Sequence, residues 1–478
     1  MKKILLLSAL ILSACQSPNA PPSTDSKVIL PASFTAAPDN PTQTDIRTWW
    51  QQFNDPTLNR LITQALENAP DLAIARSQLE KAEATARLAN ADTGPLLGAG
   101  VSGTMAMSHL DNPLSSDTRK VLQQVGSDLG SNPLSQNGAG YQMGLSGTWA
   151  PDFFGKKQSD AQAAKYGALA EVEKTHGAQL LLIATLAQHY VNARALEAQK
   201  VVLETSDKAL ADLVRYAKGR FQAAQATQYD VDDISAKRSA LQAKIATLDT
   251  QRANEIAQIA ALIGTPDMTF PPDNGKIFTH LPQAPSGQYP ADLITRRPDI
   301  RAYKAAILAQ SAKRESAAAD FYPRFTMNFG LLEGKIHLNG DLSGARLGGN
   351  GGLLGIGIEL PIFTNGRLQA QLDRADADLK TAVLNYDKAL LEALTEVNNS
   401  YRLAAALKKQ GNKLATTEKQ QQKQTTDARA LFEYGRQTFD KIATAQLATN
   451  DTAEMRIKNQ KGQALNLIRL YTALGGGW

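Results

Sequence analysis

The feature that most constrains the fold of this 478-residue chain is an internal duplication. Pro298–Ile300 repeats Pro70–Leu72 at an offset of 228 residues, and this alignment holds over roughly 25 residues. A second offset, of 211 residues, pairs Tyr190 with Tyr401, Gly155 with Gly366, Phe221 with Phe432, Thr227 with Thr438 and Gly264 with Gly475. Two constant offsets predict two copies of one structural unit that differ mainly in a single loop.

The N-terminus has the order of a secretory signal peptide. Met1–Lys3 is basic, Ile4–Leu12 is apolar, and small residues follow, so residues 1–14 are predicted to be removed. Leu12–Cys15 resembles a bacterial lipobox, in which cleavage precedes the cysteine and its thiol is acylated. The alternative is an ordinary signal peptide with a chance cysteine. Gln16 in place of Asp implies sorting to the outer membrane by the rule for bacterial lipoproteins, and the single cysteine leaves no disulfide partner.

The amino-acid composition indicates an extended N-terminal tether followed by a helix-rich body. Residues 15–48 are rich in Pro, Ser, Thr and Asp and cannot fold alone, and we expect Trp49, Trp50 and Phe53 to dock them onto the body. The net charge of +5, from 51 basic and 46 acidic residues, is small for this length. Because no basic cluster interleaves with aromatic residues, we expect no nucleic-acid partner.

Each half contains a pair of segments in which apolar and polar residues alternate. These segments predict β-hairpins at about 96–151 and 324–363, with strands of roughly 9–11 residues and loops at 109–140 and 334–352. A sheet that is half-buried in water would give the same alternation. Behind a lipobox, strands that cross the outer membrane are favoured. Because four strands cannot close a barrel with a lumen, their edges must be paired by other copies of the chain.

Long segments without proline follow each predicted hairpin. Residues 156–218 and 367–433 predict helices of about 63–67 residues, or roughly 95–100 Å. Shorter helices are predicted at 70–93 and 227–263, and at 298–320 and 438–474. In each half the two shorter helices together match the long one in length. We therefore expect them to stack end to end beside it.

Seven motifs in this order resemble a known family, the bacterial outer-membrane efflux ducts. The similarity is to the TolC-like, lipid-anchored branch of nodulation-protein and multidrug-efflux outer-membrane lipoproteins. The motifs are Leu12–Cys15, Trp49-Trp50, Asp55-Pro56, Trp149–Gly155, Arg296–Ile300, Leu360–Arg367 and Leu474–Trp478.

The resemblance implies a fold and a set of partners. The expected fold is an α+β membrane protein, a homotrimer whose twelve-stranded outer-membrane β-barrel continues into a periplasmic α-helical tunnel. The expected location is the outer membrane of a Gram-negative bacterium. The expected partners are outer-membrane lipid, a periplasmic membrane-fusion adaptor and an inner-membrane pump of the resistance-nodulation-division (RND) or major-facilitator type. The expected function is the passive export of drugs or toxic small molecules.

The same resemblance places functional residues at the two helix turns. The family motif at the turns corresponds to Arg220, Phe221, Ala224 and Thr227 in the first half, and to Gly435 and Thr438 in the second, where an adaptor is expected to bind. Ala224 and Leu431 depart from the family's Gly and Arg. Asp230 matches an acid that narrows the tunnel entrance, although its counterpart here is Lys441. We hypothesise a periplasmic gate formed by Asp230, Tyr229, Phe432 and Asp440. The alternative for Asp230 is an acid that favours a helix N-terminus.

Other conspicuous residues favour architecture over chemistry. Pro298-Asp299 suits the start of a helix, so Arg296–Arg301 is interpreted as structural, with partner recognition as the alternative. Glu359, on the polar side of its strand, is expected to face the lumen; the alternative is a charge at the lipid interface. The five histidines are scattered, with no metal-ligand spacing. We therefore expect no enzyme activity, no metal and no cofactor.

The predicted organisation is therefore a signal peptide at 1–14, a lipidated tether at 15–48, a first repeat at 49–290 and a second repeat at 291–478. An efflux duct is the leading functional interpretation. A duct for secreted protein uses the same architecture, and a trimeric envelope lipoprotein or adhesin explains the long helices but not the paired amphipathic strands.

Overall fold

The computed structural model describes residues 21–38, 43–273, 275–340 and 345–478. The predicted signal peptide and Cys15 lie outside these residues. The chain divides into two compact units. One contains Glu83–Lys165 and Leu308–Lys380, and the other contains Thr24–Ala82, Tyr166–Ile307 and Thr381–Trp478. Each unit therefore takes segments from both repeats.

The helices and strands repeat in the same order in both halves. α3 and α9 have 22 residues each, and α5 and α10 have 67 residues each, as the constant offsets predict. None of the helices in the described segments is both long and apolar enough to cross a membrane. The first half contains η1 (Trp49–Phe53), α2 (Pro56–Asn68), α3 (Pro70–Ala91), β1 (Leu96–Leu110), α4 (Ser116–Gln124), η2 (Asp128–Gly130), β2 (Leu134–Trp149), α5 (Lys156–Gln222), α6 (Gln228–Ala246), α7 (Leu248–Ile263) and η3 (Lys276–Phe278). The second half contains α8 (Asp292–Arg296), α9 (Pro298–Ala319), β3 (Arg324–Gly340), β4 (Ala345–Glu359), α10 (Arg367–Glu433) and α11 (Phe439–Ala473).

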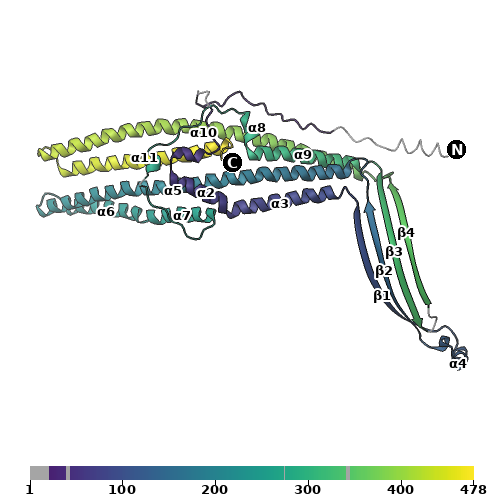
Figure 1. Ribbon diagram of the computed structural model, residues 1–478. Helices are drawn as coiled ribbons and strands as arrows, with labels where there is room; N and C mark the ends of the chain where they lie inside the picture. Colours follow the sequence, from purple (N-terminus) through teal and green to yellow (C-terminus); the bar gives the residue numbers. More distant parts are fainter. Residues whose placement is uncertain (1–20, 39–42, 274, 341–344) are drawn as a thin grey trace. The chain divides into compact units, whose positions relative to one another are not determined.

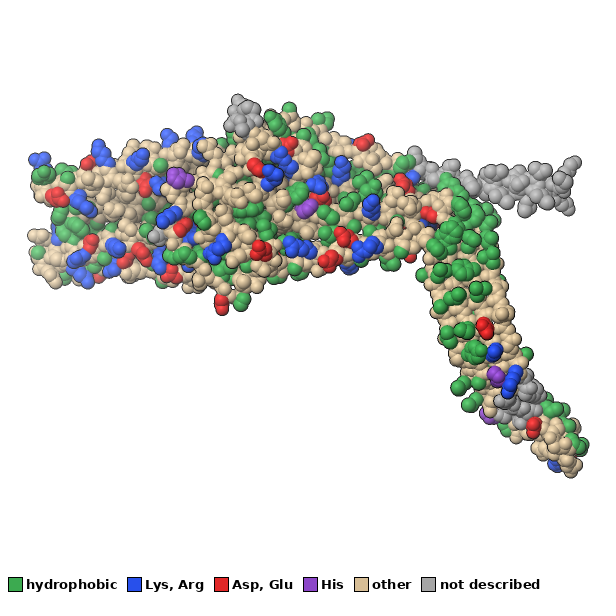
Figure 2. All heavy atoms as spheres, viewed as in Figure 1, with side chains coloured by type: hydrophobic (Ala, Val, Ile, Leu, Met, Phe, Trp, Pro, Cys, Tyr) green, Lys and Arg blue, Asp and Glu red, His purple; other side chains and the backbone are tan. Residues whose placement is uncertain are grey.

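The four strands form one antiparallel sheet in the order β1-β2-β3-β4 (Figure 1). The register places Leu145 opposite Ala99 on one side and Leu331 on the other, so the predicted apolar positions share one face. Figure 2 shows hydrophobic side chains along these strands, whereas charged side chains are scattered over the helices. The apolar face carries Leu97, Val101, Met143, Leu145, Trp149, Phe329, Leu331, Leu354, Ile356 and Ile358, most of them well exposed.

The strands are longer than the sequence predicts, at 15–17 residues instead of 9–11. β3 continues to Gly340 and β4 begins at Ala345, so most of the loop predicted at 334–352 is strand. Several glycines of the sheet have a packing role. A Cβ on Gly144 would lie 2.7 Å from the Leu332 side chain, which leans across from the neighbouring strand. Glycine in a strand interior is typical of such close approaches.

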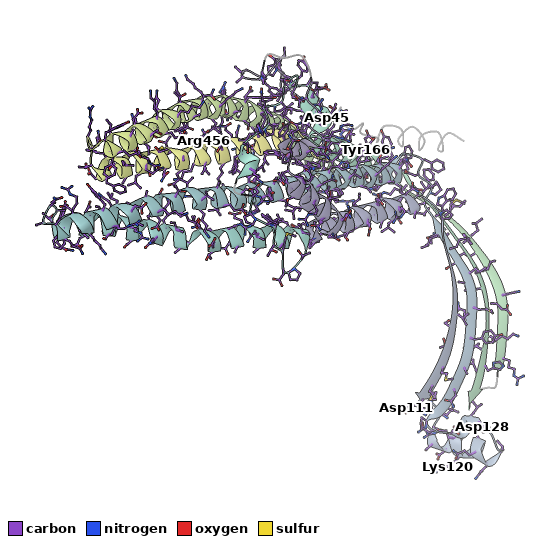
Figure 3. The ribbon with its side chains drawn as sticks, turned by 60° about the vertical axis from the view of Figure 1, so that its left-hand side comes forward. Asp45, Asp111, Lys120, Asp128, Tyr166 and Arg456 are labelled. Atoms are coloured by element: carbon purple, nitrogen blue, oxygen red, sulfur yellow. The ribbon has the colours of Figure 1, made fainter. Side chains whose placement is uncertain are left out.

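The connection between β1 and β2 folds into its own small structure. Asn112 organises it: its Nδ2 donates to the carbonyl oxygens of Leu129 and Ser131, at 2.7 and 2.8 Å. α4 and η2 lie in this connection, where Figure 3 labels Asp111, Lys120 and Asp128. In the described residues the first-half connection is therefore the long one, which accounts for most of the difference between the two offsets.

The aromatic residues after the tether pack into the core of the helical unit. Trp49 is 1% exposed and stacks on Tyr471 with a centroid distance of 5.4 Å. The Tyr471 hydroxyl donates to Gln52 Oε1 at 2.7 Å. The expectation that Trp49, Trp50 and Phe53 dock this segment is confirmed, since all three are buried. Burial of such side chains contributes roughly 1.5–3 kcal/mol each.

In each half the end of the returning helix meets the start of a short helix. Gly264 follows α7 with φ +81°, and a Cβ there would lie 3.1 Å from Pro70, the first residue of α3. Gly475 follows α11 with φ +79°, and a Cβ there would lie 2.8 Å from the carbonyl group of Arg296, two residues before α9. The predicted end-to-end stacking is therefore present in both repeats. Only glycine fits these positions, because both the backbone angle and the space exclude a side chain.

One helix departs from the prediction. The helix expected at 227–263 is divided at Thr247 into α6 and α7, whereas α11 is continuous. The Thr247 hydroxyl donates to the Lys244 carbonyl oxygen at 3.1 Å. Threonine hydroxyls make bonds of this kind inside the continuous α10 and α11 as well, so this bond alone does not explain the break. α5 extends to Gln222 instead of 218, so Gly219 lies inside the helix, which ends at the turn of Ala223 and Ala224.

We predict that Gly475→Ala destabilises the protein by about 2 kcal/mol or more, because a left-handed alanine costs roughly 1–2 kcal/mol and its Cβ also clashes with Arg296. Thermal unfolding of the purified variant measures this. The matched control is Gly167→Ala within α5, where a Cβ meets nothing and alanine favours the helix by up to about 1 kcal/mol. Equal melting temperatures for the two variants would contradict this account of the joint.

Candidate functional site at the helix turns

The two turns that connect the long helices to the returning helices have the same backbone geometry. After α5, the N–H of Ala224 donates to Phe221 O at 2.9 Å, and the N–H of Gln225 donates to Arg220 O at 2.8 Å. After α10, the N–H of Gly435 donates to Phe432 O and the N–H of Arg436 donates to Leu431 O, both at 2.8 Å. This 5→2 and 6→1 pairing is the Schellman arrangement, which satisfies the last carbonyl groups of a helix.

The fifth residue of each six-residue pattern adopts a left-handed conformation. Gly435 does so with φ +67°, which glycine tolerates freely. Ala224 does so with φ +56°, which strains a residue that has a Cβ. The departure from glycine at Ala224 therefore leaves the turn geometry intact, at a cost in stability.

Asp230 forms a capping box with Thr227 at the start of α6. Its Oδ2 accepts from the Thr227 N–H at 2.8 Å and from the Thr227 hydroxyl at 2.7 Å. These hydrogen bonds, the backbone one above all, lower the pKa of the Asp230 carboxyl, and the Arg220 charge adds to the effect. In the second turn Lys441 replaces the acid, and Thr438 makes no side-chain cap bond. The helix-start role of Asp230 is therefore present in the structure.

A cluster of aromatic rings joins the two turns. Phe439, the first residue of α11, lies 5.0 Å from Tyr216 of α5 and 5.9 Å from Phe432 of α10, measured between ring centroids. The guanidinium of Arg220 lies 6.0 Å from the Tyr216 ring. Tyr216 and Phe439 are not among the functional residues expected from the sequence. The sequence does place an aromatic residue beside each turn: Tyr216 lies one helical turn before Arg220, and Phe439 directly follows Thr438. This proximity to the turns could have indicated that the two residues belong to the site.

The four residues of the hypothesised gate are not brought together within one chain. Phe432 belongs to the aromatic cluster and Asp230 to the capping box, while Tyr229 is 77% exposed and Asp440 is half-buried. Over the described segments, no hydrogen bond, ion pair or ring contact joins two of these four side chains. Glu359 is exposed at the end of β4, where its register partner Arg324 begins β3, and both lie on the polar face with Asn328.

The Arg296–Arg301 segment binds the C-terminal residues of the chain. The Trp478 indole N–H donates to Arg296 O at 3.0 Å, and Arg297 Nη1 donates to Ala473 O at 2.8 Å. Arg301 lies over the Trp478 ring and pairs with Glu173 at 2.6 Å. These contacts stay within the chain, as the architectural interpretation of the segment expects.

Comparison with known proteins identifies the family. The model of the outer membrane efflux protein family matches residues 61–265 and 289–476, one segment in each repeat. The chain belongs to this family. It is an outer-membrane efflux duct of the Gram-negative type, and the fold class expected from the sequence is confirmed.

Two relatives and one solved structure illustrate the similarity. The pyoverdine export outer membrane protein OpmQ of Pseudomonas aeruginosa is 27% identical over 100% of this chain and 97% of its own. The solvent efflux pump outer membrane protein SrpC of Pseudomonas putida is 27% identical over 89% of this chain and 86% of its own. The structure of the outer-membrane channel OprN is similar with a TM-score of 0.77 at 21% identity, covering 96% of this chain and 99% of that one.

We predict that Ala224→Gly stabilises the efflux duct by about 1 kcal/mol, because it removes the left-handed strain, and that Gly435→Ala destabilises it by a similar amount. Because the two positions are equivalent, each variant is the matched control of the other. Hydrogen exchange of the two turns or thermal unfolding measures the difference. Changes of the same sign in both variants would show that the turns are not equivalent.

Proposed function

We propose that this chain is the exit duct of a three-part machine that exports toxic small molecules. Three copies assemble so that their sheets close a twelve-stranded barrel, and a periplasmic adaptor and an inner-membrane pump complete the path. An acyl chain on Cys15 anchors each copy to the outer membrane. The observation that carries the proposal is the four-stranded sheet, with one apolar face and a full 15-residue strand at each edge.

The sheet supports assembly for a physical reason. In lipid, every backbone N–H and C=O must be bonded within the protein, because no water is available to replace a missing partner. Among the residues that the structure describes, β1 pairs only with β2 and β4 pairs only with β3, so one edge of each of these strands is open in a single chain. Pairing β1 of one copy with β4 of the next satisfies both edges without any change in the fold.

The turns support contact with an adaptor. Phe221, Leu431, Phe432 and Tyr434 are partly or largely exposed at the two turns, where apolar side chains gain most from a partner. Arg220, Ala224, Thr227, Gly435 and Thr438 hold the backbone that presents them. The adaptor that binds these turns connects the duct to its pump, which is of the RND or major-facilitator type.

The substrate proposal rests on relatives of the same family. OpmQ is named for pyoverdine export and SrpC for solvent efflux, so one duct architecture serves chemically different small molecules. Selection by the pump, with the duct as a passive conduit, accounts for this range.

Deleting the gene tests the function. We expect the minimal inhibitory concentrations of several toxic compounds to fall, and the unaltered gene on a plasmid to restore them. If no compound changes while export of a polypeptide is lost, the chain is a secretion duct. If reconstituted protein forms no channel in planar bilayers, a non-channel envelope lipoprotein is favoured.

The gate hypothesis is tested by Asp230→Asn in planar bilayers. The amide retains an acceptor for the Thr227 N–H but removes the negative charge, so the turn persists while cation preference falls. Because the pKa of Asp230 is lowered, its capping contribution is present above the ordinary value of 3.8 and is lost only as the pH falls through the lowered value. Asp233→Asn, one turn further along α6, is the control. Unchanged conductance and cation preference in Asp230→Asn would remove Asp230 from the gate.

A further inference from the structure

In the first repeat, the buried side chain of Arg194 fills the space beside the middle of α5. Arg194 is 2% exposed, and its Nε and Nη2 donate to the Tyr190 hydroxyl at 2.9 and 2.8 Å. Its guanidinium also lies 4.7 Å from the Phe270 ring. Glu197 pairs with Arg194 at 3.0 Å and with Arg252 at 2.6 Å, so each buried charge has a partner. The remaining hollow beside this network measures about 280 Å³.

The equivalent site of the second repeat has lost these large side chains. The tyrosine is retained as Tyr401, whose hydroxyl donates to Pro285 O at 2.9 Å. At the constant offset of 211 residues, Arg194 becomes Ala405, Glu197 becomes Lys408, Lys200 becomes Gly411, Glu204 becomes Ala415 and Arg252 becomes Gln463. The same backbone therefore surrounds far less side-chain volume.

The result is a cavity of about 710 Å³ between α10, α11 and the linker that contains η3. This size lies within the range of about 300–1,000 Å³ that is typical of sites for small ligands. Gln460 of α11 donates to Phe278 O of the linker at 3.1 Å and so fixes one wall. Ala36 and Pro38 of the tether lie at its rim.

A pair of amides forms a fixed polar wall. Asn459 Nδ2 donates to Leu407 O at 3.1 Å, and Gln463 Nε2 donates to Asn459 Oδ1 at 2.6 Å. Gly411 permits this arrangement, since a Cβ there would lie 2.7 Å from Asn459 Oδ1. The lining also includes the apolar side chains of Phe278, Leu281 and Leu467. The cavity therefore offers both kinds of surface to one ligand.

The described lining is positively charged. Lys408 and Arg456 line the cavity, and none of the lining residues that the structure describes is an acid. Arg456, labelled on α11 in Figure 3, pairs with Glu418 outside the lining at 2.8 Å. Lys408 is exposed, and no ion pair is formed by it within the described ranges of the chain. An ammonium group at the mouth of a half-apolar cavity favours a negatively charged ligand.

We propose that this cavity binds a small anionic amphiphile, an apolar body that carries one carboxylate or sulfonate group. The apolar body packs against Phe278 and Leu467, and the anionic group pairs with Lys408. The site lies between the wall helices and the linker, and its occupancy does not depend on whether the chain conducts.

Two dansyl probes test the proposal on the full-length chain assembled in lipid nanodiscs. Dansylglycine carries a carboxylate, and dansylamide has the same fluorophore without the charge. Binding is followed by fluorescence, with empty nanodiscs subtracted. We expect saturable binding of dansylglycine, roughly tenfold or more tighter than that of dansylamide, because hydrogen bonds to charged groups discriminate by about this factor.

Variants locate the binding. Lys408→Gln is expected to weaken dansylglycine binding by roughly tenfold or more and to leave dansylamide unchanged. Lys409→Gln, the next residue on α10 and outside the lining, is the matched control and is expected to bind as the unaltered chain does. Ala405→Arg restores the side chain of the first repeat and is expected to block both probes. Because Lys408 is exposed, its variant decides the question even if Ala405→Arg fails to fold.

Three results would overturn the proposal. The first is equal dansylglycine affinity of Lys408→Gln and Lys409→Gln. The second is the absence of saturable binding to the unaltered assembled chain, which is also the result if a neighbouring copy fills the groove. The third is equal affinity for the two probes, which would show that the charge of Lys408 plays no part.

Discussion

The rest of this fold depends on the contact between the end of one helix and the start of another. Gly264 abuts Pro70 in the first repeat, and Gly475 abuts Arg296 in the second, each in a left-handed conformation. The shorter helices, α3 with α7 and α6 in the first repeat and α9 with α11 in the second, thereby lie end to end beside one 67-residue helix. Without this joint the apolar faces of α5 and α10 would lack a partner along part of their length, and burial of those faces supplies most of the stability of a helix in water.

The two repeats retain this backbone plan but differ in the side chains that complete it. The turn after α5 uses a strained Ala224 and compensates with the Thr227–Asp230 capping box. The turn after α10 uses Gly435, and Thr438 has no side-chain cap. The two repeats also differ at the middle of the helical unit. There Arg194 fills a space in the first repeat that its counterpart Ala405 leaves open in the second. Equivalent positions of the two repeats therefore keep the same backbone geometry with different side chains.

The elements that the sequence predicted best are those bounded by residues with a single physical role. Pro70 and Pro298 can start a helix but cannot continue one, and α3 and α9 begin at them. Glycine is less informative because it serves both turns and close-packed strands, which is why β3 and β4 were predicted too short. The break at Thr247 has no residue signature, since threonines with hydroxyl bonds also lie inside the continuous α10 and α11, and the Tyr216–Phe439 contact joins residues 223 positions apart. No local pattern contains that information.

The difference between the repeats also limits what Asp230 can do in a gate. In the proposed trimer each copy contributes one Asp230 and one Lys441 at equivalent positions, so these residues alone would form a ring of alternating and cancelling charges. A net negative entrance then requires a further acid, and Asp440, beside Lys441 in the first turn of α11, is placed to provide it. Because Asp230 also accepts two hydrogen bonds from Thr227, its charge is fixed in position, whereas no side-chain bond of this kind holds Asp440 among the described residues. In the proposed gate, cation preference therefore depends on the two acids together, because removal of either charge leaves the remaining acids and the lysines equal in number.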